Sequence, residues 1–184
     1  MKYKKIWISA VCLLFLILHT SAQERYITTS GKINFFSKAT LEDITADNDK
    51  VSSIIDATTG DMAIKISIKN FEFKKKLMQE HFNENYLESD IYPTAMFKGN
   101  ILNFNTMDEN SKEFTVKGKI TIHGVTKAIE IKANCIKTAD FIKVSGNFMV
   151  ALEDFKIKIP KIVFMKIAEN IKVTFNFNHK PYKK

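Results

Sequence analysis

The chain has 184 residues and a formal net charge of +8, and Arg25 is its only arginine. A positive balance favours anionic partners, but the lysines alternate with apolar residues along predicted strands, as on the solvated face of a sheet. Because the sequence also lacks a run of arginines or a basic arm, we expect no nucleic-acid binding.

The first residues have the three-part pattern of a secretory signal peptide. Three lysines at positions 2, 4 and 5 precede an apolar run at 6–18, and Thr20-Ser21-Ala22 offers small residues for cleavage. The alternative is an uncleaved membrane anchor, but the apolar run is shorter than the roughly 20 residues that a spanning helix needs. We expect cleavage after Ala22, a periplasmic or secreted location, and one domain over residues 23–184.

The rest of the chain is dominated by short segments that alternate apolar and polar residues, with polar or glycine-containing turns between them. A pair of weaker strands is expected within 39–56, around a turn at Asp47-Asn48-Asp49. The other predicted strands are 32–37, 62–68, 97–101, 114–122, 128–136, 141–152 and 171–177.

About eight antiparallel strands with one apolar face each predict either a sandwich or a closed barrel. Gly118 and Gly146 fall on inward positions, where a missing side chain allows a strand to bend, and bent strands favour the barrel. An eight-stranded barrel is just wide enough to be filled by side chains or to hold one slender ligand. The alternation alone does not decide between these two interiors.

One segment, within 71–99, has a helical spacing of apolar residues. The stripe that we expect to face the sheet or barrel is Leu77, Met78, His81, Phe82 and Asn85. A short amphipathic helix among strands must place this stripe on the sheet or across a barrel mouth, so we interpret it as a lid or plug.

Catalytic and metal-binding patterns are weak. His81 and Glu84 are three residues apart on the predicted helix, but no second cluster of ligands converges on them, and His123 belongs to no catalytic signature. Cys135 lies in an alternating strand and is expected to be a buried apolar residue, not a nucleophile. We therefore expect no enzyme and no metal site.

A second apolar stretch, 157–167, is interrupted by Pro160. Core packing at one end of the barrel and lining of its mouth are both compatible with this pattern, and the alternatives stay open.

Several motifs together resemble the YceI-like family. They are GKINF at 31–35, FEF at 71–73, HFNENYLESD at 81–90 followed by Tyr92-Pro93 and Phe97-Lys98-Gly99, and GKITIHGVTK at 118–127. The resemblance covers nearly all of the chain after residue 22. It implies a secreted or periplasmic, lipocalin-like closed antiparallel barrel of about eight strands with one amphipathic α-helix, holding an isoprenoid or other lipid chain in an apolar tunnel.

From the residues and the resemblance together we expect a non-enzymatic carrier or store of a long-chain amphiphile, with no cofactor besides this lipid or isoprenoid ligand. Tyr86 or His123 is expected to meet the polar head group. The expected cavity lining is Phe35, Phe71, Phe73, Met78, Phe82, Phe97, Phe148 and Phe164. The alternative is a filled barrel that acts through its surface on a protein partner; a transient membrane contact and a homodimer also remain open.

Overall fold

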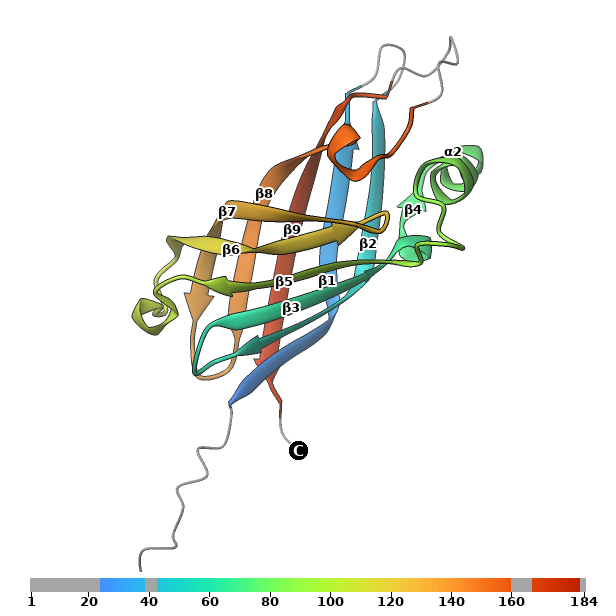
Figure 1. Ribbon diagram of the computed structural model, residues 1–184. Helices are drawn as coiled ribbons and strands as arrows, with labels where there is room; N and C mark the ends of the chain where they lie inside the picture. The colour runs from blue at the N-terminus through green and yellow to red at the C-terminus, as the bar shows by residue number, and fades with distance from the viewer. Residues whose placement is uncertain (1–23, 39–42, 160–166, 183–184) are drawn as a thin grey trace, which may run out of the picture.

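Eight strands close into an antiparallel barrel in the computed structural model, which describes residues 24–38, 43–159 and 167–182 (Figure 1). The ring order is β1-β9-β8-β7-β6-β5-β3-β2, and β2 pairs back with β1. The barrel strands are β1 (Arg25–Ser37), β2 (Ile44–Asp56), β3 (Asp61–Ser67), β5 (Thr94–Ile101), β6 (Lys112–Ile122), β7 (Val125–Lys137), β8 (Ile142–Ala151) and β9 (Asn170–Pro181). The predicted fold class, a closed eight-stranded barrel with one helix, is confirmed.

The remaining elements are short and lie between strands. β4 (Glu72–Phe73) adds two residues to the edge of β2 beyond its pairing with β3. The others are α2 (Lys76–His81), a π-helical turn η2 (Phe82–Tyr86), and the 3-10 turns η1 (Ile68–Asn70), η3 (Phe104–Thr106) and η4 (Glu153–Phe155). Among the described residues, no helix is long and apolar enough to span a membrane.

We call α2 and η2 together the lid (Lys76–Tyr86), because they lie at one end of the barrel, beside β4 (Figure 1). The predicted inward stripe of the lid is partly wrong, since Leu77 is 60% exposed and Asn85 is also exposed. The amide of Leu87 bonds to the carbonyl of Phe82, five residues back. This wider turn rotates the later residues relative to an α-helix, so Tyr86 takes the inward place expected for Asn85.

The predicted turn at 47–49 is also wrong, because β2 runs through these residues as one strand. The pairing of β1 with β2 shifts register on both sides of Gly31, and this irregularity of the ladder accommodates the polar residues of β2 without a turn. Asn48 is only 2% exposed, and its amide Nδ2 donates to the carbonyl of Ser67 while its Oδ1 accepts from the amide of Lys50. Asn48 is therefore buried, and hydrogen bonds within the chain replace those that an exposed turn residue would make to water.

Three phenylalanine rings fill the barrel half away from the lid, and each lies on an inward glycine. A β-carbon built on Gly31 would lie 2.4 Å from the ring of Phe177, and one on Gly146 would lie 2.9 Å from the ring of Phe175. The ring of Phe97 occupies the space beside both Gly99 and Gly118, which pair across β5 and β6. Missing side chains therefore let large rings lie flat against the barrel wall.

The barrel end opposite the lid, which we call the closed end, is sealed by buried polar side chains. Tyr26 is 2% exposed, and its hydroxyl lies 3.1 Å from Oε1 of Glu24. His179 is fully buried; its Nδ1 donates to the carbonyl of Ile142, so its Nε2 accepts from the hydroxyl of Ser53.

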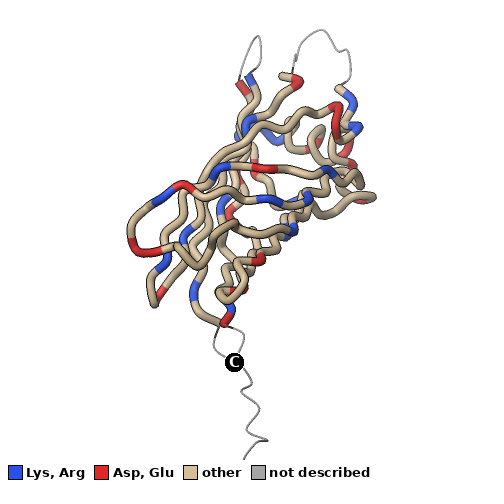
Figure 2. Tube along the Cα trace, turned by 60° about the vertical axis from the view of Figure 1, so that its left-hand side comes forward, with Lys and Arg blue, Asp and Glu red and all other residues tan. Residues whose placement is uncertain are grey.

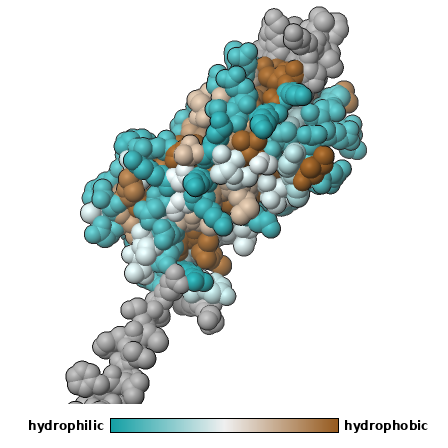
Figure 3. All heavy atoms as spheres, in the orientation of Figure 1, coloured by the Kyte–Doolittle hydropathy of each residue, from teal (hydrophilic) through white to brown (hydrophobic). Residues whose placement is uncertain are grey.

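Charged side chains are distributed over the outside of the barrel. Lysines and acidic residues are interspersed along the trace in Figure 2, with exposed ion pairs such as Lys117–Glu130 and Lys127–Asp154. The face shown in Figure 3 is largely hydrophilic, and its hydrophobic atoms form small separate patches. The apolar residues of the alternating strands therefore face inward, as the sequence predicts.

The buried histidine makes stability depend on pH. Burial lowers the pKa of His179 from 6.5 to about 4, against the opposing effect of its bond to Ile142. The unfolded chain therefore takes up a proton at a higher pH than the folded chain, and stability falls as the pH falls from 6.5 towards 4. Between about pH 7 and about pH 5, we expect this residue to cost about 2 kcal/mol in the free energy of unfolding.

The measurement is urea unfolding of the wild-type protein and of His179→Asn, whose amide can still donate to Ile142. The variant is expected to lose about 2 kcal/mol less than the wild type over this pH interval. Equal losses in the two proteins would show that His179 does not titrate in this way.

Candidate ligand-binding site

A cavity opens beneath the lid, and we call it the mouth cavity. It offers about 170 Å³ to the centres of water-sized spheres, similar to an engineered cavity of about 150 Å³ that stays dry and binds benzene. Its walls come from the lid-side ends of β1, β3, β6, β8 and β9, together with β4 and the lid itself. Almost all lining side chains are aliphatic or aromatic, so the cavity suits an apolar guest.

Four phenylalanines form one aromatic cluster where the lid meets the barrel. Phe35 comes from β1, Phe73 from β4 and Phe82 from η2, and Phe71 precedes β4. The ring of Phe35 lies 5.4 Å from those of Phe71 and Phe82 and 5.6 Å from that of Phe73, and the rings of Phe73 and Phe82 are 5.0 Å apart. Such pairs contribute about 0.5–1.5 kcal/mol each beyond area burial, so the cluster both lines the cavity and holds the lid.

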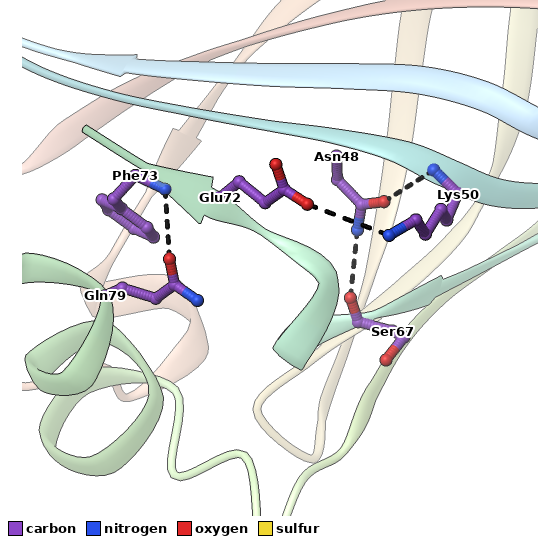
Figure 4. A network of polar contacts seen from close by, with 6 residues as sticks. All are labelled: Asn48, Lys50, Ser67, Glu72, Phe73 and Gln79. Carbon is purple, nitrogen blue, oxygen red and sulfur yellow. Dashed lines mark hydrogen bonds and ion pairs between the residues drawn. The ribbon is translucent and has the colours of Figure 1, made fainter. Parts of the chain in front are cut away.

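A polar network fixes the path of the chain into the lid (Figure 4). Asn48 ties the end of β3 to β2 through Ser67, and Lys50 on β2 pairs with Glu72 on β4 at 3.8 Å. The side-chain oxygen of Gln79 in α2 accepts a hydrogen bond from the amide of Phe73 at 3.3 Å. These contacts join β2, β4 and α2 and place the ring of Phe73 over the cavity.

A second, smaller space lies deeper in the barrel, and we call it the deep cavity. It offers about 50 Å³ and shares Ile33, Ile66, Ile120 and Phe148 with the mouth cavity. Its other walls include Phe97 and the rings of Phe175 and Phe177. Inward residues beside these spaces, such as Ile64 and Ile131, are only partly buried, as expected for side chains that border empty volume.

Two polar side chains in the mouth-cavity lining could meet a head group. Burial raises the pKa of Tyr86, and among the described residues its hydroxyl has no hydrogen-bond partner. His81 accepts at Nδ1 from the amide of Asn85, at 2.8 Å, which leaves its Nε2 to carry the ring proton as a donor. From the sequence we considered His81 for the inward stripe and as a metal ligand, but not as a polar residue of the cavity lining.

His123 occupies a different place from the one expected. It lies outside the lining of both cavities, at the β6–β7 hairpin. Its Nδ1 is 3.1 Å from the carbonyl of Phe155, its Nε2 is 2.6 Å from Oε2 of Glu88, and its ring packs edge-on against Tyr92. Through these contacts His123 joins the loop after the lid to the barrel.

The expected lining residues are distributed as follows. Phe97 borders only the deep cavity, Phe148 borders both, and Phe164 lies outside the described residues. Ile157 and Ile167 line the mouth cavity, so both described ends of the second apolar stretch face it. The residues placed at the mouth cavity as expected are Phe35, Phe71, Phe73, Met78, Phe82, Tyr86 and Phe148.

Metal-ligating side chains do not cluster in the part of the chain that the structure describes. No three histidine, cysteine, aspartate or glutamate side chains there could hold a metal ion together. Cys135 is buried, as expected, and burial raises the pKa of its thiol to about 12. Its thiol therefore stays protonated and is a poor nucleophile.

A sequence model of the YceI-like domain matches residues 18–179. The chain belongs to the YceI-like family. Three solved structures are similar to this chain, although their low identities support only the shared fold. No curated protein matches the chain.

The first structure is a polyisoprenoid-binding domain from Saccharophagus degradans implicated in plant cell wall breakdown, with 16% identity, 86% of this chain and 98% of that chain covered, and a TM-score of 0.75. The second is BcnA from Burkholderia cenocepacia, with 16% identity, coverages of 80% and 95%, and a TM-score of 0.66. The third is a YceI protein from Campylobacter jejuni, with 18% identity, coverages of 80% and 85%, and a TM-score of 0.52.

The contact between Glu88 and His123 is expected to hold the lid side of this YceI-like barrel closed. Replacing Glu88 by alanine removes a charged hydrogen bond to a mostly buried ring, and we expect it to lower the free energy of unfolding by about 1 kcal/mol. Trypsin should then cut faster at the lysines at positions 74–76, which precede and begin the lid.

The matched control is Asp90→Ala, two residues away. Its ion pair with Lys69 joins side chains that are 86% and 59% exposed, so its loss should cost less than about 0.5 kcal/mol. Equal stability and equal cleavage rates in the two variants would contradict the role given to Glu88.

Proposed function

We propose that this YceI-like protein is a non-enzymatic carrier or store for one long-chain amphiphile, of the polyisoprenoid, isoprenoid-quinone or fatty-acid type. The observation that carries the proposal is the apolar mouth cavity, bounded by the lid and continued by a deep cavity. A filled barrel acting only through its surface would not need this space, because interiors are normally packed without voids of this size.

Apolar burial supplies the driving force for such a ligand. Each buried methylene contributes about 0.8 kcal/mol, so a chain of about a dozen methylenes gives a gross gain of roughly 10 kcal/mol before the ordering costs of binding. Hydrogen bonds to a head group are then needed for orientation more than for affinity, and we assign them to Tyr86 and Nε2 of His81. The similar fold of the polyisoprenoid-binding domain from Saccharophagus degradans agrees with this ligand class.

The signal-peptide pattern at residues 1–22 supports a periplasmic or secreted location, where such a protein could collect its ligand from a membrane surface. We propose only a transient contact with that surface. Leu77 on the outside of the lid is 60% exposed and follows three lysines at positions 74–76, a combination suited to brief adsorption on anionic lipid.

The test is retention of solanesol, a long polyprenol, by the delipidated mature chain after incubation and gel filtration. Phe73→Gln places an amide at the mouth cavity and removes aromatic contact with the ligand. We expect at least a tenfold loss of affinity, because burying an aromatic side chain against the ligand contributes about 1.5–3 kcal/mol.

Phe36→Gln is the matched control. Phe36 is also a phenylalanine near the mouth, but it is 37% exposed and absent from the lining of the mouth cavity. The control should retain as much solanesol as the wild type does. If Phe73→Gln also retains as much, solanesol does not bind in the mouth cavity.

A further inference from the structure

The mouth cavity and the deep cavity lie one behind the other along the barrel. On β8, Val150 and Phe148 border the mouth cavity, and Phe148 and Val144 border the deep cavity. On β6, Ile122 borders only the mouth cavity and Val116 only the deep cavity. Every one of these positions belongs to an inward row, so the order along the strands gives the order of depth.

Phe148 has the largest side chain of the four that border both spaces; the other three are isoleucines. Its ring is only partly buried, and its centre lies 6.3 Å from that of Phe175. The next inward residue of β8 is Gly146, whose missing side chain is replaced by the ring of Phe175. The ring of Phe148 thus stands where the tunnel narrows between its two spaces.

The deep cavity has a fixed lower boundary. The rings of Phe175 and Phe177 stack with centres 5.6 Å apart, and both lie against inward glycines. Below them, the ring of His179 packs edge-on against Phe177 and is held by Ser53 and Ile142. The ring of Phe148 lies above this packed floor, between the deep cavity and the mouth cavity.

We propose that Phe148 sets the length of the ligand tail that this barrel accepts. The inference rests on the proposed function, and it adds the residue that makes the binding selective for chain length. With the ring in place, a tail fills the mouth cavity and stops. Without it, the two spaces join, and the tail gains about 10 Å of depth, judged from strand rise and tilt between Phe148 and Val144.

The experiment measures binding of a series of polyprenols from farnesol to solanesol to the delipidated mature chain, by native mass spectrometry from detergent. For the wild type, affinity should rise with chain length and then level off. For Phe148→Ala, the chain length at which affinity levels off should increase by at least one isoprene unit. Polyprenols longer than the wild-type limit should bind severalfold more tightly to this variant than to the wild type.

Two further variants separate this effect from a general change in packing. Ile131 borders only the deep cavity, so Ile131→Phe added to Phe148→Ala should refill that space and restore the wild-type limit. Phe82 borders only the mouth cavity. Phe82→Ala should therefore change the affinity for every polyprenol long enough to contact this residue, while affinity still levels off at the wild-type chain length. Circular dichroism and thermal unfolding establish that each variant is folded.

If Phe148→Ala unfolds, Ile131→Phe alone provides the test in the wild-type background, where it should leave the limit unchanged because the tail does not pass Phe148. A limit that shortens in Ile131→Phe, or stays the same in folded Phe148→Ala, would overturn the role of Phe148 while leaving the proposed function intact. Absence of binding to the wild type at every length would overturn the proposed function and this inference with it.

Discussion

The packing of aromatic rings on inward glycines decides how much of this barrel is hollow. Eight strands enclose a space that their own side chains can fill, and here Phe97, Phe175 and Phe177 fill the half away from the lid by lying against glycines of the wall. Aromatic and branched side chains line the other half without filling it, and the mouth cavity remains there. The barrel is therefore mostly filled by aromatic rings at one end and keeps its larger apolar cavity at the other.

The lid depends on two different kinds of contact. Its inner side is held by the aromatic cluster around Phe35, which a ligand would share, whereas its outer connections are polar and independent of a ligand. The bond between Glu88 and His123 closes the far end of the lid segment on the β6–β7 hairpin. Under the proposed function, a bound ligand would rearrange the aromatic contacts while the polar connections keep the lid attached.

Much of the fold follows from alternation in the sequence. The inward rows of β3, β6, β8 and β9 were predictable because a period of two places every second residue on one face. The predictions were wrong where local polarity had a tertiary explanation: Asn48 looks like a turn residue and is instead buried with its hydrogen bonds satisfied. The inward stripe of the lid was misplaced after Phe82, because the sequence does not indicate where an α-helix widens into a π-helical turn.

The candidate site was predictable in kind more than in detail. The aromatic residues expected from the lid and its approaches line the mouth cavity, since an amphipathic helix must turn its apolar side to the barrel; their contact with a ligand stays a prediction. Depth along the barrel depends on register between strands far apart in sequence, so the sequence did not separate Phe97 in the deep cavity from Phe73 at the mouth. For the same reason His123, beside a glycine at a strand end, could not be assigned to Glu88.

The most direct test of this account is the native mass spectrum of residues 23–184, purified without detergent, followed by extraction of any bound lipid. The account predicts one molecule of an apolar long-chain compound bound to each protein chain, released when the protein is unfolded. Protein of bare mass that also takes up no added polyprenol, quinone or fatty acid would contradict it and leave a barrel that acts through its surface.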